Sequence, residues 1–191
     1  MRTFIAVNVA DHVLNEVDKL IVKMQNGIVR TGCKLNWVDT ENMHLTLKFL
    51  GEIDESQAEK VIEVLGNVSI KYSPFVIKFN GLGMFPNKKS PKVLWHGLTK
   101  GEHHLKELQL LIDSELNKVG FEKEDREFHP HLTLARINFV KGGSGLDNIV
   151  NIYHNYSSGE CSIDKITFYK STLTPNGPIY EVLSEHPLSV Y

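Results

Sequence analysis

The chain has 191 residues, of which 41% are hydrophobic and 23% are charged, and its formal net charge is −2. This length favours a single domain with one sizeable core, and the composition is that of an ordinary globular protein. The small net charge excludes a protein that coats nucleic acid through a broad basic surface, so any contact with nucleic acid should be local.

In the first half of the chain, the pattern predicts a strand, a helix, an extended region and a second helix. Branched and aromatic residues over Arg2–Val9 indicate the strand. Asp11 is placed to cap the first helix, in which apolar residues recur at helical spacing. The extended region covers Leu35–Glu52, and Asp54 and Gln57 then form a capping-box pattern that opens the second helix.

The second half alternates strands with one long helix. Gly81–Pro91 is rich in Gly, Pro, Asn and Lys, which predicts a loop between two strands. A buried stripe of leucine and isoleucine predicts a helix over Glu102–Val119, and Gly120 ends it. The predicted strands are Phe75–Phe79, Val93–Leu98, His131–Asn138, Ser162–Leu173 and Ile179–Leu183, the last two joined as a hairpin. This order indicates an α+β fold, and no linker divides residues 1–191 into separate domains.

Cysteine usage and hydrophobicity suggest a cytoplasmic location. Cys33 and Cys161 form no metal-ligand pair and no disulfide framework, and isolated thiols fit a reducing compartment. The apolar run near Met1 is too short for a signal sequence or a membrane span, and no other run approaches membrane length. We therefore expect a cytoplasmic protein without membrane attachment.

The tetrapeptide His-Leu-Thr-Leu occurs twice, starting at His44 and at His131, nearly half the chain apart. On a strand, alternate side chains share a face, so the histidine and threonine of each copy should project together while the leucines enter a core. One His-x-Thr on a strand is usually structural, but two identical copies favour a shared functional site. The two copies form one site if the halves of the chain pack about a pseudo-twofold axis.

Two histidines suit the cleavage of a phosphodiester. An attacking water must lose a proton and a leaving alkoxide must gain one, and imidazoles in opposite protonation states supply both functions near neutral pH. Thr46 and Thr133 could donate hydrogen bonds to phosphoryl oxygens. Nothing in this scheme requires a metal or another cofactor.

The segments HLTLKFLGE and FHPHLTLARI resemble the paired motifs of the two-histidine phosphoesterase superfamily, and in particular its RNA 2′,3′-cyclic phosphodiesterases, historically called 2′–5′ RNA ligases. The resemblance extends through MRTFIAVNV, NWVDTENMHLTLKFLGE, GMFPNKKSPKVLWHGL and STLTPNGPIYEVL. It implies a bilobal fold in which two pseudo-symmetric lobes, with antiparallel sheets, flank a central cleft and carry helices outside. It also implies a monomeric enzyme, without an obligate protein partner, that acts on RNA ends bearing a 2′,3′-cyclic phosphate, such as tRNA fragments.

The resemblance assigns roles that the residues alone leave open. His44 matches the proton donor to the leaving ribose oxygen, and His131 matches the proton acceptor that activates water. Attack on the cyclic phosphate would release the 3′ oxygen and leave a 2′-phosphomonoester. Thr46 and Thr133 match the threonines that contact the phosphate. The residues themselves do not distinguish the acid from the base.

Phe49 and Arg136 each lie five positions after their histidine. The resemblance implies that Phe49 stacks on the terminal base and that Arg136 contacts the phosphate. In a regular strand this odd spacing would direct both side chains to the face opposite the histidine, so a bulge, a twist or a strand end must intervene. The alternative for Phe49 is an ordinary core aromatic.

Other interpretations remain open at this level. A metal site from His44, His129 and His131 is conceivable, although no carboxylate lies at a suitable spacing to complete it. The main activity could instead be 2′–5′ ligation of RNA ends, or the protein could bind RNA ends without catalysis. A further hypothesis is a lysine-lined RNA path beyond the terminal nucleotide, formed by Lys48, Lys78, Lys88, Lys89, Lys92 and Lys170.

Overall fold

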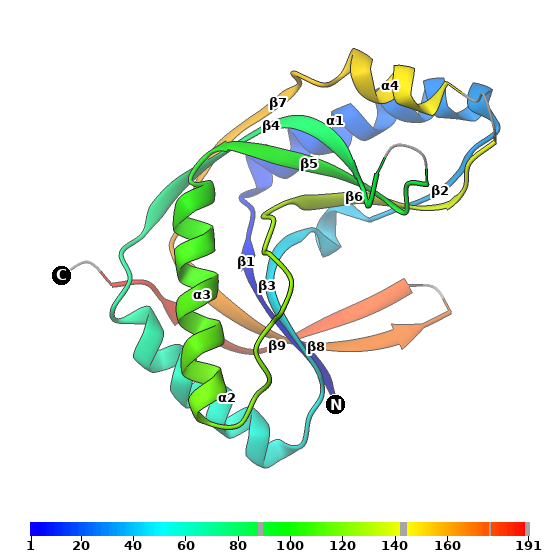
Figure 1. Ribbon diagram of the computed structural model, residues 1–191. Coiled ribbons are helices and arrows are strands. Elements are labelled where there is room, and N and C mark those ends of the chain that lie inside the picture. The colour runs from blue at the N-terminus through cyan, green and yellow to red at the C-terminus, as the bar shows by residue number, and fades with distance from the viewer. Residues whose placement is uncertain (88–89, 142–144, 176, 190–191) are drawn as a thin grey trace.

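The computed structural model describes residues 1–87, 90–141, 145–175 and 177–189. Within these ranges the strands form two antiparallel sheets, one with the order β3-β1-β8-β9 and one with the order β2-β6-β5-β4-β7 (Figure 1). The first sheet contains β1 (Arg2–Asn8), β3 (His44–Glu52), β8 (Lys165–Thr174) and β9 (Gly177–Pro187). The second sheet contains β2 (Lys34–Trp37), β4 (Phe75–Phe85), β5 (Val93–Lys100), β6 (Leu132–Phe139) and β7 (Ser157–Ile163).

Each sheet is covered by two helices on its outer side (Figure 1). The helices are α1 (Asp11–Ile28), α2 (Glu55–Ser69), α3 (Glu102–Lys118) and α4 (Leu146–Ile152). Helices α2 and α3 pack together beside the first sheet, and α1 and α4 pack together beside the second. The element order predicted the α+β class, and the family resemblance implied the two lobes seen here.

Both sheets combine strands from the two halves of the chain. The central strand β1 pairs with β3 on one side and with β8, from near the end of the chain, on the other. In the second sheet β2 pairs with β6. Because strands from both halves pair within each sheet, backbone hydrogen bonds tie the two halves of the chain together in both lobes.

Several predicted elements are confirmed. The first strand and the three long helices form close to their predicted positions, and the last two strands, β8 and β9, pair as the predicted hairpin. Asp54 and Gln57 make both hydrogen bonds of the capping box at the start of α2. The side chain of Asp11, in contrast, makes no cap hydrogen bond, because the N-cap position of α1 is Ala10.

Two local predictions are wrong, and one helix was not predicted. The interval Ser162–Leu173 is not one strand: β7 ends at Ile163, β8 begins at Lys165, and the two belong to different sheets. Gly81–Phe85 is not part of a loop, because β4 continues to Phe85 and pairs there with β5. The short helix α4 was not predicted, since its seven residues are too few for a clear helical period.

The cores beneath the sheets are apolar, and Ile5, Ala6 and Val7 of the central strand are fully buried. No helix in the described part of the chain is both long and apolar enough to cross a membrane.

Candidate active site

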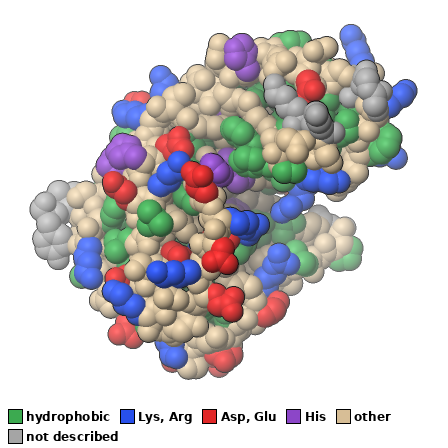
Figure 2. All heavy atoms as spheres, viewed as in Figure 1, with side chains coloured by type: hydrophobic (Ala, Val, Ile, Leu, Met, Phe, Trp, Pro, Cys, Tyr) green, Lys and Arg blue, Asp and Glu red, His purple; other side chains and the backbone are tan. Residues whose placement is uncertain are grey.

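The two motif copies lie on strands that meet where the lobes meet. His44 is the first residue of β3, and His131 directly precedes β6. Strand β3 contacts β6, and the amide of Val38 donates a hydrogen bond to the carbonyl of Leu134 in the second motif (2.9 Å). The space-filling view shows the surface hollowed between the lobes, with histidine, lysine and arginine side chains around the hollow (Figure 2).

Within each copy the side chains alternate as predicted. Both leucines of each copy are buried, namely Leu45, Leu47, Leu132 and Leu134. The histidines and threonines are only partly buried, namely His44, Thr46, His131 and Thr133. In each copy the two leucines therefore pack in the core, and the strand presents an imidazole and a hydroxyl group on its other face.

His44 lies in an aromatic cluster of the first sheet. Its ring stacks on Phe4, with 4.6 Å between centroids and 22° between planes, and Tyr180 approaches it edge-on at 5.3 Å. Tyr169 lies 5.1 Å from Phe4 and 6.0 Å from the His44 ring, stacked against both. Burial among these rings lowers the pKa of His44 from 6.5 to about 4, against the opposing effect of a backbone hydrogen bond to Asn42. The ring is therefore neutral in the unliganded protein at neutral pH.

His131 has a comparable environment in the second sheet. Its Nδ1 lies 2.6 Å from the carbonyl oxygen of His129, and because a carbonyl only accepts, Nδ1 must donate. Phe85 approaches the ring edge-on at 5.1 Å, and Trp95 lies 6.4 Å away. Burial lowers the pKa of His131, and the nearby charge of His129 acts in the same direction. In this neutral tautomer Nε2 has an unprotonated lone pair, as a proton acceptor requires.

The structure contains the irregularity that the odd spacing of Phe49 requires. In the pairing of β1 with β3, Ala6 faces Thr46 whereas Ile5 faces Lys48, so the register skips Leu47. After this shift the side chain of Phe49 lies on the histidine face, and its ring is 6.1 Å from the ring of Phe4. Phe49 is 63% exposed, so the interpretation as a core aromatic is wrong.

An equivalent irregularity occurs in the second copy. Trp95 faces Thr133 whereas Leu94 faces Ala135, so the register of β5 with β6 skips Leu134. The skipped residue is the fourth of its motif, as Leu47 is in the first copy. Arg136 is consequently exposed while its neighbour Ala135 is buried. The two copies therefore match in register as well as in sequence.

Arg136 and Arg2 approach the His44 cluster from different sheets. Burial raises the pKa of the Tyr180 hydroxyl, and the charges of Arg136 and Arg2 act in the opposite direction. Tyr180 itself touches the ring of His44. The charge of Arg136, on the second sheet, thus reaches Tyr180, a residue of the first sheet that contacts the ring of His44.

The hypothesis of a lysine-lined RNA path fails at Lys48. Its side chain is 6% exposed and its Nζ forms an ion pair with Asp113 Oδ1 inside the protein. Lys170 pairs with Glu181 at 3.0 Å, and Lys78 and Lys92 are exposed. Two further candidates, Lys88 and Lys89, lie outside the described residues.

No arrangement of three or more His, Cys, Asp or Glu side chains suited to a metal ion occurs in ranges 1–87, 90–141, 145–175 and 177–189. The alternative ligand set of His44, His129 and His131 is therefore not assembled there. His129 is instead exposed, with Nε2 at 3.8 Å from a carboxylate oxygen of Glu127.

Comparison with known proteins identifies the family. Residues 13–95 and 99–180 match the LigT-like phosphoesterase family in two consecutive segments, and each segment contains one motif copy. The chain belongs to this family. The LigT-like relatives include a Methanocaldococcus jannaschii protein, 40% identical over 185 residues (97% of this chain, 99% of the relative), and one from Archaeoglobus fulgidus, 39% identical over 183 residues (96% and 98%). Both relatives are named RNA 2′,3′-cyclic phosphodiesterase.

Solved LigT-like structures share the fold. A crystal structure of a Thermus thermophilus protein superposes with a TM-score of 0.78 at 24% identity and covers 98% of each chain. The crystal structure of Escherichia coli LigT complexed with 3′-AMP gives a TM-score of 0.77 at 22% identity and covers 99% of this chain and 98% of that one. The resemblance inferred from the motifs is thereby confirmed at the level of family and fold.

Sequence reasoning missed the aromatic rings around both histidines. These residues are Phe4, Tyr169 and Tyr180 beside His44, and Phe85 and Trp95 beside His131. All five lie on predicted strands or in segments that carry the family resemblance, so their presence was visible. Their contact with the histidines depends on strand register, for which the sequence holds no local signal.

Proposed function

We propose that this protein hydrolyses RNA 2′,3′-cyclic phosphodiester ends to 2′-phosphomonoesters by a metal-free mechanism that uses His44 and His131. The observation that carries the proposal is the duplicated His-x-Thr unit, presented by two contacting strands with the same register shift in each copy. The names of the LigT-like relatives support the substrate class.

In the proposed mechanism His131 is the proton acceptor. Its Nδ1–H is held by the carbonyl of His129, which leaves Nε2 free to take a proton from water. The resulting hydroxide equivalent attacks phosphorus as the bond to the 3′ oxygen breaks. The phosphate stays on the 2′ oxygen, and the protonated imidazole passes its proton to solvent before the next cycle.

His44 is the proposed proton donor, although burial keeps it neutral in the unliganded protein. A bound cyclic phosphate is an anion, and a nearby opposite charge raises the pKa of an imidazole, so substrate binding favours the protonated form. That proton goes to the leaving 3′ oxygen, and His44 is reprotonated from solvent. Thr46, Thr133 and Arg136 would hold the remaining phosphoryl oxygens as their charge increases.

Phe49 is the proposed stacking surface for the terminal base. It is exposed, lies on the same face as His44, and makes ring contact with Phe4. Stacking tolerates every base because each has a π-face. The single-stranded end of an RNA, such as a tRNA fragment, is the substrate form that this arrangement would accept.

The test uses an oligonucleotide that ends in a 2′,3′-cyclic phosphate, incubated with the protein in the presence of a chelator. We expect a 2′-phosphate product, and we expect His44→Ala and His131→Ala each to lower kcat by about 10²- to 10⁴-fold. A 3′-phosphate product would contradict the assigned leaving group. Complete inhibition by the chelator would contradict the metal-free mechanism.

Two alternatives give different outcomes in the same experiment. A ligase would join the cyclic-phosphate end to a 5′-hydroxyl RNA faster than it hydrolyses it, whereas hydrolysis is favoured in dilute RNA because water is the abundant nucleophile. A non-catalytic binder would show no turnover in the unmodified protein, and its alanine variants would lose affinity alone.

We further propose that residues 1–191 act as one domain and as a cytoplasmic monomer. The exchange of strands between the halves in both sheets supports a single cooperative unit. One unfolding transition and a monomeric mass in light scattering are the expected results.

A further inference from the structure

We propose that Lys48 and Asp113 are positioning residues that tie the first motif strand to the segment leading into the second motif. This inference rests on the proposed function, because it concerns how the two histidines are held in one geometry. It assigns a role to a buried ion pair that neither histidine touches.

Lys48 lies immediately after the register shift in β3, two residues from Thr46. The shift turns its side chain away from the site and into the protein, where 6% of it is exposed. There Nζ donates to Asp113 Oδ1 on α3 and, at 2.8 Å, to the carbonyl oxygen of Glu122. One ammonium group thus joins the strand that carries His44 to a helix and to the segment after it.

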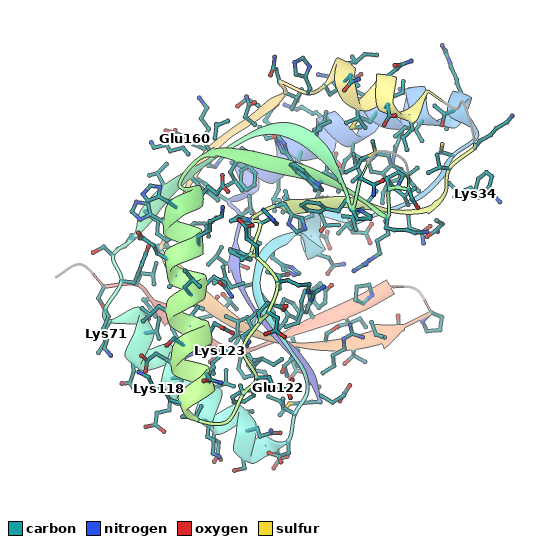
Figure 3. The ribbon with its side chains drawn as sticks, viewed as in Figure 1. Lys34, Lys71, Lys118, Glu122, Lys123 and Glu160 are labelled. Atoms are coloured by element: carbon teal, nitrogen blue, oxygen red, sulfur yellow. The ribbon has the colours of Figure 1, made fainter. Side chains whose placement is uncertain are left out.

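Asp113 completes the connection from the other side. Its carboxylate is 9% exposed, and the oxygen that binds Lys48 also accepts a hydrogen bond from the amide of Glu124 at 3.2 Å. The pair therefore holds the backbone at two nearby points, the carbonyl of Glu122 and the amide of Glu124. Figure 3 shows Glu122 and Lys123 on the segment that follows α3.

That segment runs from the end of α3 to His131 without any helix or strand. It passes across the first sheet before it enters β6 (Figure 1). At its start, the amide of Phe121 donates to the carbonyl of Leu116. At its end, the carbonyl of His129 fixes the tautomer of His131. Through the Lys48–Asp113 pair, the first motif strand binds the backbone of this segment at Glu122 and Glu124.

A buried ion pair is a poor means of gaining stability, because removing two charges from water costs about as much as their attraction returns. It does impose direction, since each charge must meet its partner and its hydrogen bonds in one geometry. An apolar contact between β3 and α3 could give similar stability without fixing the backbone of Glu122 and Glu124. This difference allows the positioning role to be separated from a purely structural one.

The test replaces both charges together, as Lys48→Met with Asp113→Leu, so that no single charge remains buried. We expect a melting temperature equal to or above that of the unmodified protein. We expect kcat for a 2′,3′-cyclic mononucleotide to fall by about 10- to 100-fold while KM changes by less than about twofold, because misplacement affects the transition state more than binding. The matched control replaces the exposed pair of the same helix, as Lys118→Met with Glu115→Leu, and should leave both constants unchanged.

Amide hydrogen exchange gives a readout that does not depend on turnover. The Glu124 amide should exchange faster in the double variant, since its acceptor Asp113 is gone, and at the original rate in the control. The single variant Lys48→Arg, with Asp113 intact, keeps a charged donor and should therefore retain most of the kcat that the double variant loses. If the double variant does not fold, Lys48→Gln with Asp113→Asn serves instead, because it also leaves no single charge buried, with an expected drop in kcat of about tenfold at constant KM.

The possible failures can be distinguished. Unaltered kcat in a folded variant that lacks the pair would overturn the positioning role, and so would unaltered exchange at Glu124. Absence of hydrolysis by the unmodified protein would instead refute the proposed function, and the exchange measurement would still decide whether the pair holds the segment.

Discussion

The low pKa of His44 predicts a specific loss of stability in acid, which His44→Gln should remove. Folding lowers the pKa of this imidazole from 6.5 to about 4, so between these values the unfolded chain binds a proton that the folded protein does not. The contribution of His44 to stability is therefore complete above about pH 6.5 and is lost as the pH falls toward 4. The gap between the two pKa values corresponds to about 3 kcal/mol.

The assay is urea unfolding at about pH 7.5 and about pH 4.5, for the unmodified protein and for His44→Gln. Over this interval the free energy of unfolding of the unmodified protein should fall by about 2.5 kcal/mol more than that of the variant. Comparing the two proteins cancels the effects of other groups, including His131, whose pKa is also lowered by burial. Parallel pH dependence in the two proteins would refute the reasoning, because His44 would then not be buried in its neutral form.

Two further predictions concern residues after the register shifts. Phe49→Ala should raise KM for an RNA 2′,3′-cyclic phosphate by about 5- to 150-fold, the equivalent of one lost base stack, and leave the melting temperature unchanged because the side chain is 63% exposed. The control is Val29→Ala, which changes another exposed apolar residue on η1 (Val29–Thr31), beyond α1. An unaltered KM in Phe49→Ala would contradict the proposed contact between Phe49 and the terminal base. Arg136→Lys should lower kcat/KM by about tenfold, because lysine cannot reproduce the paired donors of a guanidinium group, whereas Arg30→Lys should have no effect. Equal activity of the two lysine variants would exclude a phosphate contact by Arg136.

The sequence predicted the motif strands well because alternation is a local property. Within His-Leu-Thr-Leu each side chain adopts the predicted face, with leucines buried and the other two residues directed to the site. The spacing of Phe49 from His44 predicted that the strand must be irregular, but it did not predict at which residue the irregularity lies. Only the pairing with β1 and β5 shows that the extra residue is the last leucine of each copy.

Other features depend on contacts between distant segments, and these the sequence did not reveal. Lys48 looked like one more solvated cation, and it is buried only because Asp113, 65 residues later in the chain, lies opposite. The break between β7 and β8 is a single residue, Asp164, too short to separate two strands by composition alone. The low pKa of His44 likewise arises from rings supplied by β1, β8 and β9.

The matched register shifts also limit which insertions and deletions this architecture tolerates. Adding or removing one residue between His44 and Phe49, or between His131 and Arg136, would invert every later side chain of that strand. The neighbouring residue, Lys48 or Leu50 in the first copy and Ala135 or Ile137 in the second, would then occupy the position of the aromatic or the guanidinium group. Among natural homologues, the distance from each histidine to the fifth following residue should therefore vary less than any loop length. A homologue that keeps both tetrapeptides but has an altered distance should be regarded as an inactive descendant, however similar the remainder of its chain.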